Sequence, residues 1–214
     1  MPGDLSKPSA IAAILLASGF SKRFGKRNKL LVPFRNKPLA RYTLELATAM
    51  DFSGGVYFIT ASDDVAALAS DLSAVKVIKN NNPDKGLRES IRLGVEAAGL
   101  GVGYYIFFLC DQPFLDAGSV QKILDAGQHG CIVEPRCRAK PEDMEPQGNL
   151  GPPGAPCLFS ADFREELISL GEGETPRIIK SRHPEALRVA YISNPLALED
   201  IDDEKTLKRF LQPD

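Results

Sequence analysis

Residues 104–113 read Tyr104-Tyr105-Ile106-Phe107-Phe108-Leu109-Cys110-Asp111-Gln112-Pro113. The run is apolar on both faces as far as Leu109, which is typical of a central strand in a sheet covered by helices on both sides. We therefore predict a buried strand over Tyr104–Cys110, with Asp111 directly after it. Similar short runs predict five further strands at Ile11–Ala17, Val56–Ala61, Val75–Lys79, Cys131–Glu134 and Leu187–Ile192.

Amphipathic segments alternate with these strands. This alternation predicts an α/β fold, a three-layer α/β/α sandwich with a mostly parallel central sheet, in a single domain over residues 1–214. One stretch, Pro135–Pro156, interrupts the pattern with six prolines and three glycines, and we expect a long loop there. A loop of this length is either a lid or binding element, or a disordered insertion. The expected helices are Leu39–Met50, Asp64–Leu72, Leu87–Ala98, Gly118–Ala126, Ala161–Leu170 and Asp203–Leu211.

Composition excludes several classes of protein. The 214 residues include 26 Lys and Arg against 28 Asp and Glu, a net charge of −2 that does not suggest a nucleic-acid partner. No apolar run approaches the roughly 18 residues that span a bilayer, so we expect no membrane partner. The apolar run Ile11–Ala17 superficially resembles a secretory signal, but a buried first strand explains it better. With four cysteines and no Cys-x-x-Cys pair, we expect neither a disulfide framework nor a structural zinc site. Because no export signal is convincing, the chain is predicted to be cytoplasmic.

The segment that follows the first strand, Leu16–Leu31, combines small residues with many cations. Gly19 allows close approach of the backbone to a ligand, and Lys or Arg occupies five of the eight positions from Lys22 to Lys29. A polyanion such as a nucleoside triphosphate fits this arrangement, and a solvated basic loop is the alternative. The spacing matches neither a P-loop nor a Gly-x-Ser-x-Gly elbow, and the two histidines give little support for a catalytic triad.

Several motifs along the chain carry a specific resemblance. The opening Leu-Ala-Ser-Gly-Phe-Ser-Lys-Arg-Phe-Gly (16–25), with Asn28-Lys29 and Asn36-Lys37-Pro38-Leu39 after it, resembles the signature of the small-molecule nucleotidyltransferases. Within that superfamily it is most similar to molybdenum cofactor cytidylyltransferases. Three later segments agree in order: 82–91, with Asn-Pro, Gly-Leu and Ser-Ile; 109–113, with Asp-Gln-Pro; and 200–203, with Asp-Ile-Asp. The resemblance implies the Rossmann-like nucleotidyltransferase fold.

The same resemblance implies roles for individual residues. Arg23, Lys29 and Asp111 would be catalytic, the two cations by holding the triphosphate and stabilising the departing pyrophosphate. Asp111 and Asp202 would hold Mg²⁺, with Asp200 behind them, although these aspartates could instead occupy turn or helix-capping positions. Ser90 would lie near the base, unless it is a helix-surface serine. The nucleotide-binding set is Leu16, Ala17, Ser18, Gly19, Ser21, Arg23, Lys29, Gly86 and Ser90.

The activity implied is transfer of CMP from CTP to the terminal phosphate of molybdopterin, with release of pyrophosphate and a molybdenum hydroxylase as the recipient of the product. The chain departs from the family pattern at Ser18, at Ala155, where the family has histidine, and over 173–177. The last two departures fall on the acceptor side. Three alternatives therefore stay open: guanylyl transfer to the same acceptor, nucleotidyl transfer to another small-molecule phosphate, and a non-catalytic accessory protein that binds the cofactor.

Overall fold

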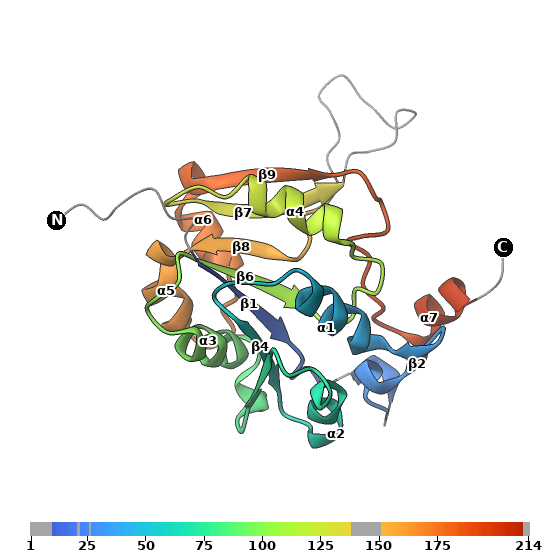
Figure 1. Cartoon of the computed structure of the whole chain (residues 1–214). Coiled ribbons are helices and arrows are strands. Elements are labelled where there is room, and N and C mark those ends of the chain that lie inside the picture. Colours follow the sequence, from blue (N-terminus) through green and yellow to red (C-terminus); the bar gives the residue numbers. More distant parts are fainter. Residues whose placement is uncertain (1–9, 21, 26, 138–150, 212–214) are drawn as a thin grey trace.

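A computed structural model describes residues 10–20, 22–25, 27–137 and 151–211. One sheet of seven strands runs through the molecule in the order β5-β4-β1-β6-β8-β7-β9 (Figure 1). Neighbouring strands are parallel except for β8, which is antiparallel to both β6 and β7. The strands are β1 (Ile11–Leu16), β4 (Val56–Thr60), β5 (Val75–Lys79), β6 (Tyr104–Leu109), β7 (Ile132–Cys137), β8 (Cys157–Ser160) and β9 (Leu187–Ile192).

The two most apolar strands lie side by side at the centre of the sheet. β1 and β6 pair in register from Ile11 opposite Tyr104 to Leu16 opposite Leu109. Their inner residues are buried on both faces, because helices cover each side. The predicted α/β sandwich with a mostly parallel sheet is confirmed.

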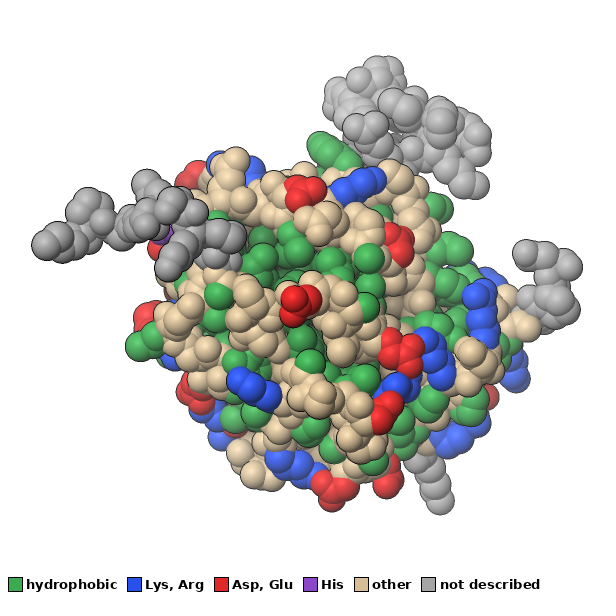
Figure 2. All heavy atoms as spheres, viewed as in Figure 1, with side chains coloured by type: hydrophobic (Ala, Val, Ile, Leu, Met, Phe, Trp, Pro, Cys, Tyr) green, Lys and Arg blue, Asp and Glu red, His purple; other side chains and the backbone are tan. Residues whose placement is uncertain are grey.

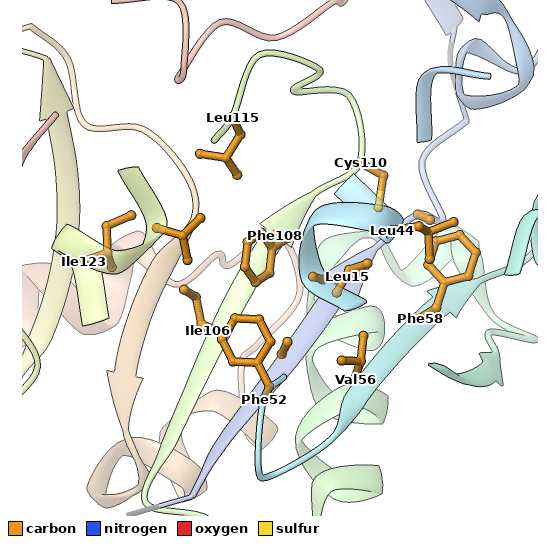
Figure 3. Close-up of a cluster of buried hydrophobic side chains, with 14 of the residues drawn as sticks. Leu15, Leu44, Phe52, Val56, Phe58, Ile106, Phe108, Cys110, Leu115 and Ile123 are labelled. Carbon is orange, nitrogen blue, oxygen red and sulfur yellow. The ribbon is translucent and has the colours of Figure 1, made fainter. Parts of the chain in front are cut away.

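Alternate residues of β1 contribute to two separate buried clusters, one on each face of the sheet. Ala13 and Leu15 pack with α1 (Leu39–Ala49) and α4 (Ala117–Asp125). Figure 3 shows part of this cluster, with Leu15, Leu44 of α1 and Phe58 of β4 drawn together. On the opposite face, Ala12 and Ile14 pack with three helices: α3 (Leu87–Ala98), α5 (Arg164–Ile168) and α6 (Arg177–Arg182).

A third, smaller cluster brings the last helix of the chain beside the segment that follows β1. Phe24 and Phe34 are buried together with Ile201 and Leu207. Leu207 belongs to α7 (Glu204–Leu211), and Phe34 belongs to the short hairpin β2–β3 (Pro33–Phe34 and Lys37–Pro38). The cluster therefore places residues 200–203 next to the basic segment, although about 170 positions separate them.

Four elements differ from the sequence predictions. The strand β8 and the helix α6 were not expected, whereas the expected helix over Ala161–Leu170 is a 3-10 turn (Ala161–Phe163) followed by the short α5. The expected helix over Asp64–Leu72 is likewise α2 (Asp63–Ala66) followed by a 3-10 turn (Ala67–Ala69).

The long loop begins later than predicted, because β7 continues through Pro135 to Cys137. Much of the predicted loop, residues 138–150, lies outside the described residues. Within the described part of the chain, no helix combines the length and the apolar character needed to cross a bilayer. On the face drawn in Figure 2, acidic and basic side chains are interspersed.

Candidate active site

Two cavities meet where the central strands end at their carboxyl edge. In open α/β sheets this edge is where ligands bind. Leu16, Leu87 and Leu109 line both cavities, so the two spaces share a wall. The smaller cavity, about 220 Å³, is lined by the segment after β1, by the start of α3 and by the end of β6, including Lys29, Ser90 and Asp111.

Lys29 lies between two carboxylates at the rim of the smaller cavity. Its Nζ donates to Asp111 and to Oδ1 of Asp202, the latter at 2.8 Å. Local structure holds the lysine there, because the Asn28 side chain accepts from the backbone N–H of Leu30 at 3.1 Å and Leu30 is buried. Arg23, which is largely exposed, donates to the other oxygen of Asp202 at 2.7 Å. The structure therefore brings together Arg23, Lys29, Asp111 and Asp202, four charged residues of the candidate site.

The segment before α7 is hydrogen-bonded through its backbone to the residue that follows β6. Ile201 N–H donates to the carbonyl of Asp111 at 2.9 Å, which sets the aspartates on either side of Ile201 beside Asp111. Asp203 caps the N-terminus of α7, because its Oδ1 accepts a hydrogen bond from the N–H of Thr206 at 2.7 Å. Neither Asp200 nor Asp202 is therefore used as the cap of the final helix.

The charges of this cluster perturb one another. Burial disfavours the charged form of Lys29, but Asp111 and Asp202 outweigh it and raise the pKa of that ammonium. The hydrogen bond from Lys29 lowers the pKa of Asp202. Asp200, by contrast, is poorly solvated and close to the charge of Asp111, so its pKa is raised to about 6. Perturbed groups gathered at a cavity are typical of functional sites.

The backbone after β1 opens toward the smaller cavity and also toward a third cavity of about 250 Å³. Ala17 N–H donates to the carbonyl of Ile59 at 2.8 Å, and the Ser18 hydroxyl donates to the same carbonyl at 3.2 Å. The hydroxyl that distinguishes Ser18 from the family pattern is thus bonded within the sheet. A Cβ on Gly19 would meet no atom within 4 Å, so the space beside it is open to a ligand. Ser21, also predicted to bind the nucleotide, lies outside the described residues.

The start of α3 forms the opposite wall of the smaller cavity. Gly86 joins a 3-10 turn (Pro83–Lys85) to α3 with φ of +76°, a conformation that favours glycine. Ser90, one turn into the helix, is buried and accepts from Nδ2 of Asn80 at 3.1 Å. Ser90 is therefore not a helix-surface residue. Asn80 was absent from the predicted site, and only its position directly after a predicted strand could have suggested it.

The larger cavity, about 570 Å³, is mostly apolar, with prolines and leucines contributed by residues 151–156, by Pro176 and by Leu198. Its cations are Arg177 and Lys180 of α6. Lys180 Nζ donates to buried Glu134 at 2.9 Å, and this pair was not predicted. A signal was present, since Glu134 is a charged residue at the end of an otherwise apolar strand. Ala155, which replaces the family histidine, also lines this cavity.

The family model for the MobA-like NTP transferase domain matches residues 13–187. This chain belongs to that family. It is a nucleotidyltransferase, and the resemblance read from its motifs is confirmed at the level of the superfamily, together with the Rossmann-like fold.

Individual relatives cover much of this MobA-like domain. A nicotine blue oxidoreductase from Paenarthrobacter nicotinovorans is 24% identical over 210 residues, which is 98% of this chain and all of that protein. A molybdenum cofactor guanylyltransferase from Cupriavidus metallidurans is 28% identical over 164 residues, 76% of this chain and 75% of that one.

Solved structures share the fold. A nucleotidyl transferase from Methanothermobacter superposes with a TM-score of 0.76 at 18% identity, covering 94% of this chain and 95% of the other. The manganese complex of Rv0371C from Mycobacterium tuberculosis gives a TM-score of 0.71 at 21% identity, with 95% and 98% covered.

Nucleotidyltransferases of this kind generally use a divalent metal ion, and the carboxylates of this MobA-like domain fit one. Oδ1 of Asp111 and Oδ1 of Asp200 are buried without a hydrogen-bond partner in the described structure. No three His, Cys, Asp or Glu side chains of the described residues converge as a ready-made metal site. Mg²⁺ does not need one, because it is usually held by one or two carboxylates together with substrate phosphates and water. The donor set therefore suits a metal that arrives with a nucleotide.

Proposed function

We propose that this MobA-like enzyme transfers CMP from CTP to the terminal phosphate of molybdopterin and releases pyrophosphate. The observation that carries the proposal is the position of Lys29, paired with Asp111 and Asp202 at the junction of the two cavities. Cations and carboxylates at one edge suit a triphosphate and its metal, and a second cavity beside them gives room for an acceptor.

The nucleotide belongs in the smaller cavity. The open backbone at Gly19 admits the ribose and base, while Lys29 and Arg23 contact the phosphates. Both cations have carboxylate partners in the described structure, so a triphosphate would exchange these ion pairs for phosphate contacts. As the bond to the α-phosphorus breaks, charge grows on the departing pyrophosphate, and the two cations stabilise it.

Asp111 and Asp202 are the residues that would hold Mg²⁺, with the buried carboxylate of Asp200 behind them. When bound, the metal neutralises and orients the phosphates of the nucleotide. The hydrogen bond and the charge of Lys29 lower the pKa of Asp202, and the same ammonium contacts Asp111.

The acceptor belongs in the larger cavity, next to the shared leucines. Its terminal phosphate oxygen attacks the α-phosphorus in line with the departing pyrophosphate, so one P–O bond forms as another breaks. A phosphate monoester is already an anionic nucleophile, which means that no general base is needed, and neither histidine lines the two cavities. Arg177 and Lys180, which line the same cavity, supply positive charge for a second polar group of the acceptor.

The choice between CTP and GTP needs its own test, because one relative is named a molybdenum cofactor guanylyltransferase. The decisive experiment measures pyrophosphate release with Mg²⁺ and molybdopterin, comparing CTP, GTP, ATP and UTP. Turnover with CTP alone supports cytidylyl transfer, whereas preference for GTP reassigns the nucleotide and keeps the reaction. If no triphosphate turns over while CTP still raises the melting temperature, the chain is a cofactor-binding accessory protein instead.

The product would be a dinucleotide form of the cofactor, for which a molybdenum hydroxylase is the expected recipient. We expect the reaction to take place in the cytoplasm. Addition of an apo-hydroxylase to the reaction tests the recipient, because its activation should follow the same nucleotide preference as pyrophosphate release.

A further inference from the structure

A buried polar pair behind the smaller cavity has no part in the charged cluster. It consists of Asn80, which follows β5, and Ser90 of α3, with 1% and 2% of their surfaces exposed. Buried side-chain amides and hydroxyls are costly unless they are hydrogen-bonded, so their bonding pattern is informative.

The orientation of the Asn80 amide follows from the backbone. Oδ1 of Asn80 accepts from the backbone N–H of Asn82 at 2.9 Å. A backbone N–H only donates, so the atom that faces it must be the oxygen of the amide. Nδ2 therefore faces Ser90 Oγ at 3.1 Å, and in this bond Asn80 donates and Ser90 accepts.

The hydrogen bond from Asn80 determines which way the O–H proton of Ser90 points. A hydroxyl that accepts from an amide keeps its own proton for another partner. In the described structure the Ser90 hydroxyl donates no hydrogen bond, and Ser90 lines the smaller cavity. The proton is therefore available to a ligand in that cavity.

In a nucleotide bound in the smaller cavity, the base rather than the phosphates would reach Ser90. Ile91, next to Ser90, packs on one face of the sheet, whereas Leu30, next to Lys29, packs on the other. A nucleotide whose phosphates contact Lys29 thus extends across the edge of the sheet toward α3. There it meets apolar side chains, Pro83 and Leu87, which suit a flat ring.

We propose that Asn80 is a positioning residue for the nucleobase: its amide holds Ser90 Oγ as an acceptor and directs the Ser90 hydroxyl proton toward an acceptor atom of the base. Cytosine presents such atoms at O2 and N3, so its Watson–Crick edge can accept this hydrogen bond. This inference rests on the proposed function, since it assumes that the smaller cavity binds a nucleoside triphosphate.

The test reverses the hydrogen bond without removing a heavy atom. In Asn80→Asp one carboxylate oxygen still accepts from Asn82 N–H, and the other accepts from Ser90, which turns the hydroxyl proton away from the cavity. Ser90→Ala removes that proton altogether. We expect the dissociation constant of CTP to rise about fivefold in both variants, the loss of one neutral hydrogen bond.

Inorganic tripolyphosphate serves as the probe that lacks a base. Its dissociation constant should stay at the wild-type value in both variants, which also shows that the variants are folded. Ser119→Ala is the matched control, because Ser119 is a buried helical serine, bonded to Asp116 at 3.0 Å in α4, away from both cavities. It should bind CTP as the wild type does.

Binding of CTP and tripolyphosphate is measured by calorimetry, independently of turnover. Unchanged CTP binding in Asn80→Asp and Ser90→Ala overturns the inference, as does equal weakening of tripolyphosphate. If Asn80→Asp does not fold, the dissociation constants of CTP and tripolyphosphate for Ser90→Ala test the inference. A wild type that binds CTP but releases no pyrophosphate contradicts the proposed function alone and leaves this inference testable.

Discussion

Lys29 and Asp202, separated by 173 positions in the sequence, form an ion pair of 2.8 Å at the carboxyl edge of the central sheet. The contact depends on the buried cluster that holds the start of α7 against the segment after β1. A cation from the start of the chain and a carboxylate from its end are thus parts of one site. Lys29 also contacts Asp111, so two carboxylates share one ammonium.

Replacing Lys29 tests the charge balance of the site. In Lys29→Met the side-chain volume is kept, but Asp111 and Asp202 lose their shared cation and face one another and Asp200. We expect about 3 kcal/mol less free energy of unfolding, typical of a partly buried ion pair that loses one partner. Pyrophosphate release should fall at least about 100-fold, because the departing charge is no longer stabilised.

Magnesium supplies a second measurement on the same variant. A divalent cation can replace the missing ammonium, so Mg²⁺ should raise the melting temperature of Lys29→Met more than that of the wild type. Lys79→Met is the control, since Lys79 is an exposed lysine that pairs with Asp63 and belongs to a different ion pair from Asp111 and Asp202. An equal response of wild type and Lys29→Met to Mg²⁺ would show that the carboxylates do not bind the metal.

Asp111→Asn tests the carboxylate that follows β6. The substitution keeps the shape of the side chain and removes one negative charge from a position that is largely buried. Pyrophosphate release should fall about 100-fold or more, with little loss of stability, because the charge of Asp111 raises the pKa of Asp200 and that repulsion is relieved. The control is Asp125→Asn, an exposed carboxylate of α4 that accepts from Gln121. Activity above a tenth of the wild-type value in Asp111→Asn would rule out a metal-holding role.

The centre of the fold was predictable because it depends on local patterns. β1 and β6 are apolar on both faces, and no other position in an α/β sheet suits such strands. β8, by contrast, has four residues, and its antiparallel pairing with β6 depends on strands far away in the chain. Nothing within those four residues specifies that pairing.

The charged half of the candidate site was predictable for a different reason. Cations cluster in one short segment after β1, and Asp111 follows a strand end, so each is visible in the local sequence. The contacts of Asn80 with Ser90 and of Lys180 with Glu134 join different elements of the fold. Polar residues of this kind look ordinary in sequence until the packing buries them.

Gly94 tests how closely α3 must pack on β1. A Cβ at this position would lie 2.4 Å from Cγ2 of Ile14, which is fully buried. Gly94→Ala should therefore push α3 away from the sheet and lower the free energy of unfolding by about 1–3 kcal/mol, measured by chemical denaturation. Since Ser90 lies one turn earlier in the same helix, CTP should also bind more weakly.

Gly101→Ala is the matched substitution, because a Cβ there meets no atom within 4 Å. It should leave both the free energy of unfolding and CTP binding at wild-type values. Equal stabilities for Gly94→Ala and Gly101→Ala would show that α3 is not packed against β1 as described.

Glu134 gives the protein a predicted dependence of stability on pH. The side chain is 4% exposed and accepts from Lys180 at 2.9 Å and from Arg136. Burial opposes its charged form, but the hydrogen bonds from these two cations outweigh it and lower the pKa of Glu134. A carboxyl with a lowered pKa stabilises the fold above its unfolded pKa, about 4.3, and loses that contribution as the pH falls through the folded value.

Glu134→Gln removes this contribution and keeps the side-chain shape. At pH 7 the free energy of unfolding of the variant should be about 2 kcal/mol lower than that of the wild type, because Lys180 and Arg136 lose a buried charged partner. The difference should shrink progressively below about pH 4, as the wild-type carboxyl itself becomes protonated. Glu165→Gln, at an exposed position of α5, is the control and should follow the wild type throughout. A stability difference for Glu134→Gln that stays constant from pH 7 to pH 3 would mean that the contribution of Glu134 is packing rather than charge.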